Sequence, residues 1–325
     1  MPARHRIKWT LFATQSLGSA GFLISSTITP ILGAALAGAA WAGLPAQAQA
    51  ALATRPVPAT GEALPLVGLG TWITFNVGSN EKLREARAQV MQTFFDRGGT
   101  LIDSSPMYGS SEAVIGHGLA RIKNRSALFS AGKVWTMLKP LGVNQMENSR
   151  KLWGVERFDL MQVHNLLDWD THLETLKAMK AQGRVRYIGI TTSQNWRHGD
   201  LEKIMRSERL DFVAFSYNVV DREVEDRLLP LAAERGIAVI VNRPFQEGVL
   251  IDRMKHRPLP PWAGEIDCAN WAQFLLKFIV SHPAVTCAIP ATGKVKHLID
   301  NMAAGTGRLP DAATRLRMVK FEDTF

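Results

Sequence analysis

Residues 100–121 read TLIDSSPMYGSSEAVIGHGLAR, and this stretch contains the unit from which most of the chain is built. Residues 100–104 form a short, largely apolar run, which is typical of a strand buried on both faces. A polar loop follows, and residues 111–121 then place apolar side chains at helical spacing. A buried strand, a loop and an amphipathic helix together make one β/α unit.

The same pattern recurs along the chain. Short apolar runs predict eight strands, at residues 66–70, 100–104, 127–133, 160–164, 185–191, 212–217, 238–242 and 286–290. Amphipathic stretches predict helices at residues 82–97, 111–121, 138–153, 171–181, 198–205, 222–235, 271–281 and 295–303. Eight such pairs within residues 64–325 predict an α/β fold, a (β/α)8 TIM barrel in a single domain. A doubly wound open sheet is the rival, but no Gly-x-Gly-x-x-Gly opens the first helix.

The composition is that of a globular protein. The chain has 325 residues, of which 46% are hydrophobic and 21% are charged. Its formal net charge is +9, but the basic residues are scattered, which favours small anionic ligands over nucleic acid. Cys268 and Cys287 are not spaced like metal ligands, so we expect core thiols and no metal site. A disulfide between them becomes an option only in an oxidising compartment.

Residues 1–50 differ from everything after them. A short basic start precedes an uncharged, Ala- and Gly-rich stretch at residues 9–50, which ends in small residues suited to cleavage. This plan is that of a secretory signal peptide. The apolar stretch also approaches the length of an uncleaved membrane anchor, and a cytoplasmic protein with a disordered or mis-started leader is a third reading. We expect residues 51–63 to be a linker to the barrel.

Four ionisable residues fall at the carboxyl ends of consecutive predicted strands. Asp103 ends the second strand and Tyr108 lies in the loop after it, while Lys133 ends the third strand and His164 ends the fourth. Chemistry in such barrels takes place at this end of the strands, so all four side chains should face one mouth. Taken singly, each has an ordinary alternative as a helix cap, a surface charge or a packed core residue.

Together, the four residues could deliver a proton. The ammonium group of Lys133 would favour the phenolate of Tyr108 and lower its pKa from about 10. Asp103 would keep the lysine charged and oriented, and a neutral His164 could hydrogen-bond a carbonyl oxygen. The set would then act as a proton donor to an alkoxide that forms as a hydride arrives.

These residues and their contexts resemble the catalytic tetrad of the aldo-keto reductase superfamily. Residues 103–109 resemble that family's Asp-(small)-(small)-x-x-Tyr-Gly motif, residues 68–72 resemble its opening strand, and the similarity covers residues 64–305. The resemblance implies an enzyme that reduces an aldehyde or ketone with NADPH or NADH. Tyr108 would be the general acid, Lys133 and Asp103 its tuners, and His164 the group that orients the carbonyl.

The resemblance also implies where a dinucleotide would lie. Ser193 matches a residue that hydrogen-bonds the nicotinamide carboxamide, residues 243–248 match a segment over the pyrophosphate, and residues 292–301 match the adenosine end. The cofactor-binding residues that it implies are Gly70, Thr71, Trp72, Ser193, Gln194, Arg243, Pro244, Phe245, Gly248, Thr292, Lys294, His297 and Asn301.

Four positions depart from the family's pattern. Gln194 stands where Asn is common, and Ala214 stands where a Gln usually joins the carboxamide clamp. Asn242 replaces an aromatic residue that often stacks on nicotinamide. His297 replaces an Arg that often grips the 2′-phosphate of NADP, and bidentate recognition by Arg is not reproduced by His or Lys. NADP and NAD both stay open, with a lean to NADP from Lys294 and the positive net charge.

Two other functions stay open beside the reductase. A Schiff-base lyase could use Lys133 as its nucleophile, although Asp103 would keep that lysine protonated. A low-activity or regulatory cofactor-binding barrel would account for the altered clamp, although the tetrad is complete. We expect a small-molecule carbonyl substrate, no nucleic acid, and membrane contact only through residues 1–50 if they stay uncleaved.

The leader and a nicotinamide cofactor together favour export of an already folded protein to the periplasm or the medium. Such cofactors are reduced inside the cell, so the chain would load its cofactor before it leaves. The folded-protein route reads adjacent arginines, and here His5 interrupts the pair. We predict a mature protein that begins after Ala48 or Ala50. N-terminal sequencing tests this, and an intact Met1 would contradict it.

Overall fold

The computed structural model describes residues 51–324, which belong to one compact unit. The segment for which a signal peptide or anchor is expected, residues 1–50, lies outside the described residues. Within residues 51–324, no helix combines the length and apolar character that a membrane crossing requires.

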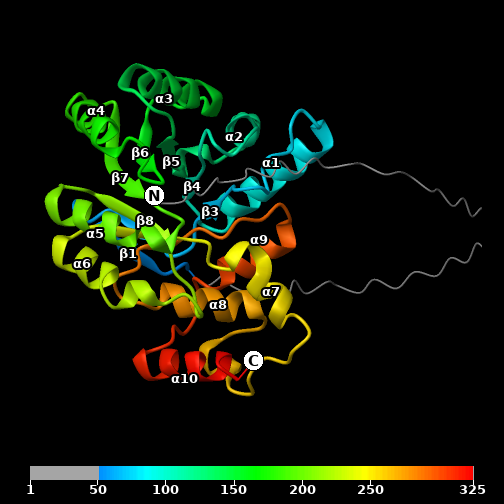
Figure 1. Cartoon of the computed structure of the whole chain (residues 1–325). Coiled ribbons are helices and arrows are strands. Elements are labelled where there is room, and N and C mark those ends of the chain that lie inside the picture. The colour runs from blue at the N-terminus through cyan, green and yellow to red at the C-terminus, as the bar shows by residue number, and fades with distance from the viewer. Residues whose placement is uncertain (1–50, 325) are drawn as a thin grey trace, which may run out of the picture. The chain divides into compact units, whose positions relative to one another are not determined.

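Eight parallel strands form one curled sheet that closes into a ring, as the sequence predicts. Figure 1 shows the helices arranged around these strands. Their order in the sheet follows the chain: β3 (Leu69–Gly70), β4 (Leu101–Asp103), β5 (Phe129–Val134), β6 (Phe158–His164), β7 (Val185–Thr191), β8 (Phe212–Ser216), β9 (Ala238–Asn242) and β10 (Cys287–Ala288). The first and last strands then meet. The amide of Gly68 donates to the carbonyl oxygen of Ala288 at 2.8 Å, and the amide of Ala288 donates to Leu66 at 2.9 Å. These bonds close the barrel.

Helices surround the ring at all the predicted places. They are α1 (Glu81–Asp96), α2 (Ser111–Leu119), α3 (Lys139–Trp153), α4 (Trp169–Ala181), α5 (His198–Ser207), α6 (Leu228–Arg235), α8 (Trp271–Val280) and α9 (Val295–Ala303). One boundary is wrong. The helix expected at residues 222–235 is split into a 3-10 turn, Glu223–Glu225, and α6. Pro230 explains the break, because proline offers no N–H to residue 226 and its ring crowds that carbonyl group.

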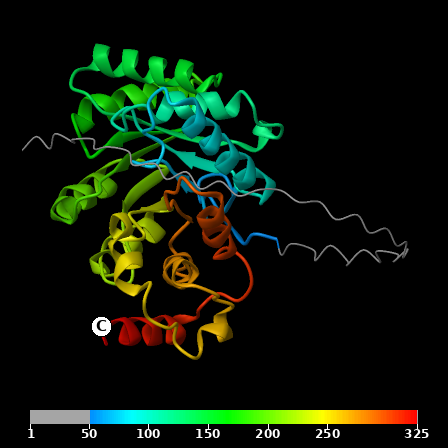
Figure 2. The ribbon, with the colours of Figure 1, turned by 90° about the vertical axis from the view of Figure 1, so that its right-hand side faces the viewer.

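Two helices lie outside the predicted set. α7 (Val249–Met254) follows the loop after β9, and α10 (Ala312–Glu322) ends the described chain. α10, red in Figure 2, packs against α8, where Arg315 donates to the carbonyl oxygen of Phe278 and to Ser281 Oγ at 3.3 Å. The ring of Phe321 also stacks on Trp271.

Residues 51–63 are not the expected linker, because they begin a hairpin that packs against the barrel. β1 (Thr54–Pro56) and β2 (Ala63–Pro65) pair antiparallel. Val57 and Leu64 are buried with the side chains that point into the ring. Glu62 pairs with Arg186 and accepts from the hydroxyl of Tyr187 at 2.6 Å, at the start of β7. The hairpin therefore covers the end of the barrel where the strands begin.

The ring is filled and leaves no pore. Alternate strand residues form an interior cluster, whose members from the strands and their ends are Leu101, Phe129, Ala131, Leu160, Tyr187, Phe212, Ala214, Ala238, Ile240, Cys287 and Ile289. The other face of each strand packs against the helices in a second, larger cluster. With one end covered and the middle filled, the mouth at the strand carboxyl ends is the place for a ligand.

The contact between α2 and α3 yields a prediction about stability. A Cβ atom on Gly116 would overlap the carbonyl oxygen of Leu152 in α3. Gly116→Ala should therefore lower the free energy of unfolding by about 1–3 kcal/mol, the usual cost of overpacking. This loss should appear although alanine favours a helix by about 1 kcal/mol.

The matched control is Gly199→Ala in α5, where an added Cβ meets open space. Urea denaturation should show an unchanged or higher stability for this variant. Equal effects of the two substitutions would contradict the proposed tight contact at Gly116.

Candidate active site

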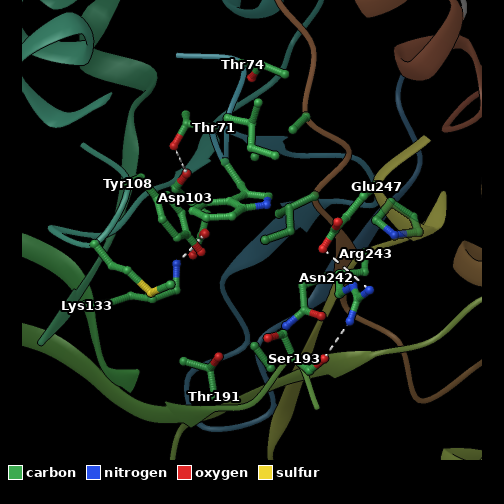
Figure 3. Close-up of a pocket in the computed structure, with 18 of the residues that line it drawn as sticks. Thr71, Thr74, Asp103, Tyr108, Lys133, Thr191, Ser193, Asn242, Arg243 and Glu247 are labelled. Atoms are coloured by element: carbon green, nitrogen blue, oxygen red, sulfur yellow. Dashed lines mark hydrogen bonds and ion pairs between the residues drawn. The ribbon is translucent and has the colours of Figure 1, made fainter. Parts of the chain in front are cut away.

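The four predicted side chains meet at the carboxyl end of the ring. Asp103 ends β4, Lys133 is the next-to-last residue of β5, and His164 ends β6. Tyr108 lies in the loop between β4 and α2. All four line one cavity of about 300 Å³, and Figure 3 shows Tyr108 beside Asp103 and Lys133. β4, β5 and β6 are neighbours in the sheet, so residues far apart in the sequence share this mouth.

Asp103 and Lys133 form a buried ion pair. Their side chains are 3% and 4% exposed. The ammonium group of Lys133 donates to Asp103 Oδ1 and, at 2.9 Å, to the carbonyl oxygen of Ser104. The amide of Gln162 approaches the second oxygen of Asp103 at 3.4 Å. Burial raises the pKa of the Asp103 carboxyl and lowers the pKa of Lys133, and the attraction between the two groups opposes both shifts.

Tyr108 lies among three side chains of the mouth. Lys133 Nζ is 5.2 Å from the centre of its ring, and the rings of Trp72 and His164 are centred 4.9 and 5.5 Å from it. The phenol and the ammonium group are therefore neighbours, which the expected proton chemistry requires. The hydrogen bonds of Lys133 go to other partners, so the ammonium group acts on the phenol through space.

The pKa of Tyr108 moves opposite to the expected direction. Burial raises it well above 10, and the negative charge of Asp103 adds to the rise. The expectation that Lys133 would lower this pKa is wrong for this structure, because desolvation of the phenolate outweighs a lysine whose charge is offset by Asp103. The phenol is consequently protonated at neutral pH.

His164 is buried and neutral. The residue is 4% exposed, and burial together with the charge of Lys133 keeps the pKa of His164 well below 6.5. Nδ1 lies 2.7 Å from the hydroxyl oxygen of Ser105. That contact leaves Nε2 as the ring nitrogen available to a ligand in the cavity.

Amide and hydroxyl groups line the other half of the cavity. The amide and hydroxyl of Ser193 approach Asn165 Oδ1 at 3.3 and 3.5 Å. Asn242 Nδ2 donates to the carbonyl oxygen of Thr192 at 3.1 Å, and Ser216 donates to Asn242 Oδ1 at 2.9 Å. Asn242 is thus held in one orientation at the place where the family often has an aromatic ring.

Several residues of the cavity were not expected from the sequence. Asn165 follows His164 directly, so its position after a strand end was a usable signal. Further lining residues that were not predicted are Ile73, Thr74, Met107, Thr191 and Ala291. Ile73 has a φ of 61°, which is rare for a β-branched residue, and its side chain is exposed at the mouth.

The loop of residues 243–248 forms one wall of the cavity. Arg243, Pro244, Phe245 and Gly248 all line it. The guanidinium group of Arg243 donates to the carbonyl oxygen of Ser193 at 2.9 Å and lies 3.5 Å from the carboxylate of Glu247 (Figure 3). This loop therefore presents a cation to the cavity, tied down on both sides.

The remaining predicted positions divide into two groups. Gly70, Thr71 and Trp72 line the cavity, and Thr71 Oγ1 donates to the carbonyl oxygen of Asp103 at 2.9 Å. The predicted residues outside its lining are Gln194, Thr292, Lys294, His297 and Asn301. Gln194 lies in a neighbouring hollow, and the last four lie between β10 and the end of α9.

The start of α9 carries exposed basic side chains. Lys294 immediately precedes the helix, and its amide donates to Thr292 Oγ1 at 3.2 Å. Lys294 and His297 are exposed, whereas Thr292 and Asn301 are buried.

Cys268 and Cys287 are buried free thiols. Among residues 51–324, no cluster of three or more His, Cys, Asp or Glu is arranged to hold a metal ion.

The sequence and the fold are similar to those of known proteins. The sequence model described as "Aldo/keto reductase family" matches residues 66–315. Methylglyoxal reductase YeaE of Escherichia coli is 26% identical over 253 residues, 74% of this chain and 85% of that protein. The NADH-specific methylglyoxal reductase of the same organism is 25% identical over 228 residues, 60% and 68% of the two chains. An aldo/keto reductase from Klebsiella pneumoniae, solved with NADP and acetate, superposes with a TM-score of 0.68 at 23% identity, over 80% of this chain and 92% of that one.

Proposed function

The chain belongs to the aldo/keto reductase family, and we propose that it reduces the carbonyl group of a small aldehyde or ketone to an alcohol, with Tyr108 as the proton donor. The observation that carries this proposal is the meeting of Tyr108, His164 and the Lys133–Asp103 pair in one cavity. Two relatives bear the name methylglyoxal reductase, which makes small carbonyl compounds the first substrates to try.

A nicotinamide dinucleotide, NADPH or NADH, is the proposed hydride source. The donors on the polar side of the cavity suit its parts: Ser193 and Asn165 for a carboxamide, and Arg243 for a pyrophosphate. The exposed Lys294 suits a phosphate on the adenosine. When bound, the cofactor supplies the hydride. The Klebsiella pneumoniae relative was solved with NADP, and one Escherichia coli relative is named for NADH, so both forms are candidates.

The protein's own groups orient the carbonyl and deliver the proton. His164 is neutral, so its Nε2–H can donate to the carbonyl oxygen and set its angle. Tyr108 keeps its proton because of its high pKa, yet an alkoxide is a stronger base than a phenolate and still removes it. Lys133, 5.2 Å from the ring centre, stabilises the phenolate left behind.

The contacts of Lys133 favour this reaction over Schiff-base chemistry. A nucleophilic lysine needs a free lone pair. Here the ammonium group is held by Asp103 and by the carbonyl oxygen of Ser104. Both partners are acceptors, and they stabilise the protonated form. Lys133 is therefore better suited to electrostatic support than to attack on a carbonyl carbon.

We also propose that the enzyme works outside the cytoplasm after folded export. This part rests on residues 1–50 alone, with their basic start, uncharged stretch and small residues at the end.

Tyr108→Phe should reduce the turnover of methylglyoxal and other aldehydes by at least 100-fold, because it removes the transferable proton. Dinucleotide affinity should stay within about twofold of wild type, since the phenyl ring preserves the packing against Trp72. Absorbance at 340 nm measures the first quantity, and quenching of tryptophan fluorescence measures the second.

Tyr187→Phe is the matched control, because it also removes a phenolic hydroxyl group, but at the opposite end of the barrel, beside Glu62. It should retain activity. If Tyr108→Phe keeps activity within tenfold of wild type, the assignment of the proton donor is wrong.

Lys294→Ala should weaken NADPH binding by about tenfold, the loss of one charge-assisted contact worth roughly 1.4 kcal/mol, and leave NADH binding unchanged. The exposed Lys203 on α5 offers a control substitution that should affect neither cofactor. Fluorescence titrations of the wild type and both variants with each dinucleotide give the six dissociation constants needed. A wild-type protein that binds NADH more tightly than NADPH would overturn the lean to NADP.

A further inference from the structure

The hydroxyl group of Ser105 is fully buried and has no part in the proposed proton transfer. Ser105 lies in the loop after β4, between Asp103 and Tyr108, and has 0% of its surface exposed. Its Oγ is 2.7 Å from His164 Nδ1. The backbone N–H of Met107 donates to the same oxygen at 3.2 Å. Ser105 thus links His164 to the loop in which Tyr108 lies.

The number of protons and lone pairs at this contact decides which atom donates the hydrogen bond. A serine hydroxyl has one proton and two lone pairs. One lone pair of Ser105 Oγ accepts the N–H of Met107. Among the described residues, the acceptor within reach of the serine proton is His164 Nδ1. If Nδ1 carried a proton instead, the serine proton would be buried without a partner, which is unfavourable.

We propose that Ser105 is a positioning residue that holds His164 in the tautomer protonated on Nε2. The proposal rests on the proposed carbonyl reduction for its functional meaning. A carbonyl oxygen can only accept a hydrogen bond, so the ring must present an N–H to the cavity. The other tautomer would present a lone pair and repel the carbonyl oxygen. Because His164 stays neutral, double protonation does not supply the missing N–H.

Packing alone does not account for the hydroxyl. The neighbouring Ser104 is also fully buried, and its Oγ has no hydrogen-bond partner among the described residues. The two adjacent buried serine hydroxyls therefore differ in their hydrogen bonds: Ser105 Oγ contacts the histidine and the N–H of Met107, and Ser104 Oγ contacts neither. This pair provides a matched comparison, since Ser→Ala removes the same atoms from the same loop in both cases.

The test is a long-range ¹H–¹⁵N NMR spectrum of the full-length protein labelled on histidine, in which protonated and unprotonated ring nitrogens have distinct shifts. The chain has eight histidines, so His164→Gln identifies the signal by its loss. We expect a proton on Nε2 in the wild type and in Ser104→Ala. Ser105→Ala should show a clear fraction of Nδ1–H, and Ser105→Thr should restore the wild-type pattern.

Kinetics provide the second measurement. Ser105→Ala should lower kcat/KM for an aldehyde by about tenfold, with dinucleotide affinity unchanged, and Ser105→Thr should recover part of the loss. A wild-type His164 protonated on Nδ1 would overturn the proposal, even if Ser105→Ala fails to fold. An unchanged tautomer in Ser105→Ala would also overturn it. A wild-type protein that reduces no carbonyl compound would count against the proposed function, while the spectrum would still decide the tautomer.

Discussion

The seam between the first and last strands is the constraint on which the rest of the structure depends. It is made by few bonds, because β3 and β10 are two residues long and are joined by the bridges Val67–Ala288 and Gly70–Ala291. The backbones approach so closely here that a Cβ on Gly70 would lie 2.5 Å from the carbonyl oxygen of Ile289. Glycine is thus required for closure. Closure in turn brings β4, β5 and β6 to one mouth with their polar ends together.

Burial then sets the chemistry of that mouth. The same desolvation that leaves Tyr108 protonated leaves His164 neutral, so two groups that titrate in water become fixed hydrogen-bond donors. The charge of Lys133 is retained because Asp103 is buried with it. The site is therefore prepared before a ligand arrives, and little reorganisation is needed when charge develops on a carbonyl oxygen.

The sequence predicted the parts of this structure that depend on local pattern. β7 and β9 lie where their apolar runs predict. The four ionisable residues could be predicted to share one mouth because the carboxyl ends of the strands converge in a barrel. What escaped prediction depends on contacts between distant segments. The hairpin β1–β2 is stabilised by burial of Val57 and Leu64 against the ring interior, which a three-residue strand does not reveal. The direction of the pKa shift at Tyr108 likewise depends on burial, which residue types alone do not specify.

The hairpin has a consequence for how the chain is attached to anything upstream. The first described residues are anchored at once: the amide of Ala53 donates to the carbonyl oxygen of Gly305 at 2.7 Å, and Leu52 packs with the core. The polypeptide thus enters the barrel at its floor, remote from the opening used by ligands. An engineered tag or tether at Ala51 would join the barrel at that floor, so immobilisation through this end of the described chain leaves the mouth of the cavity unobstructed.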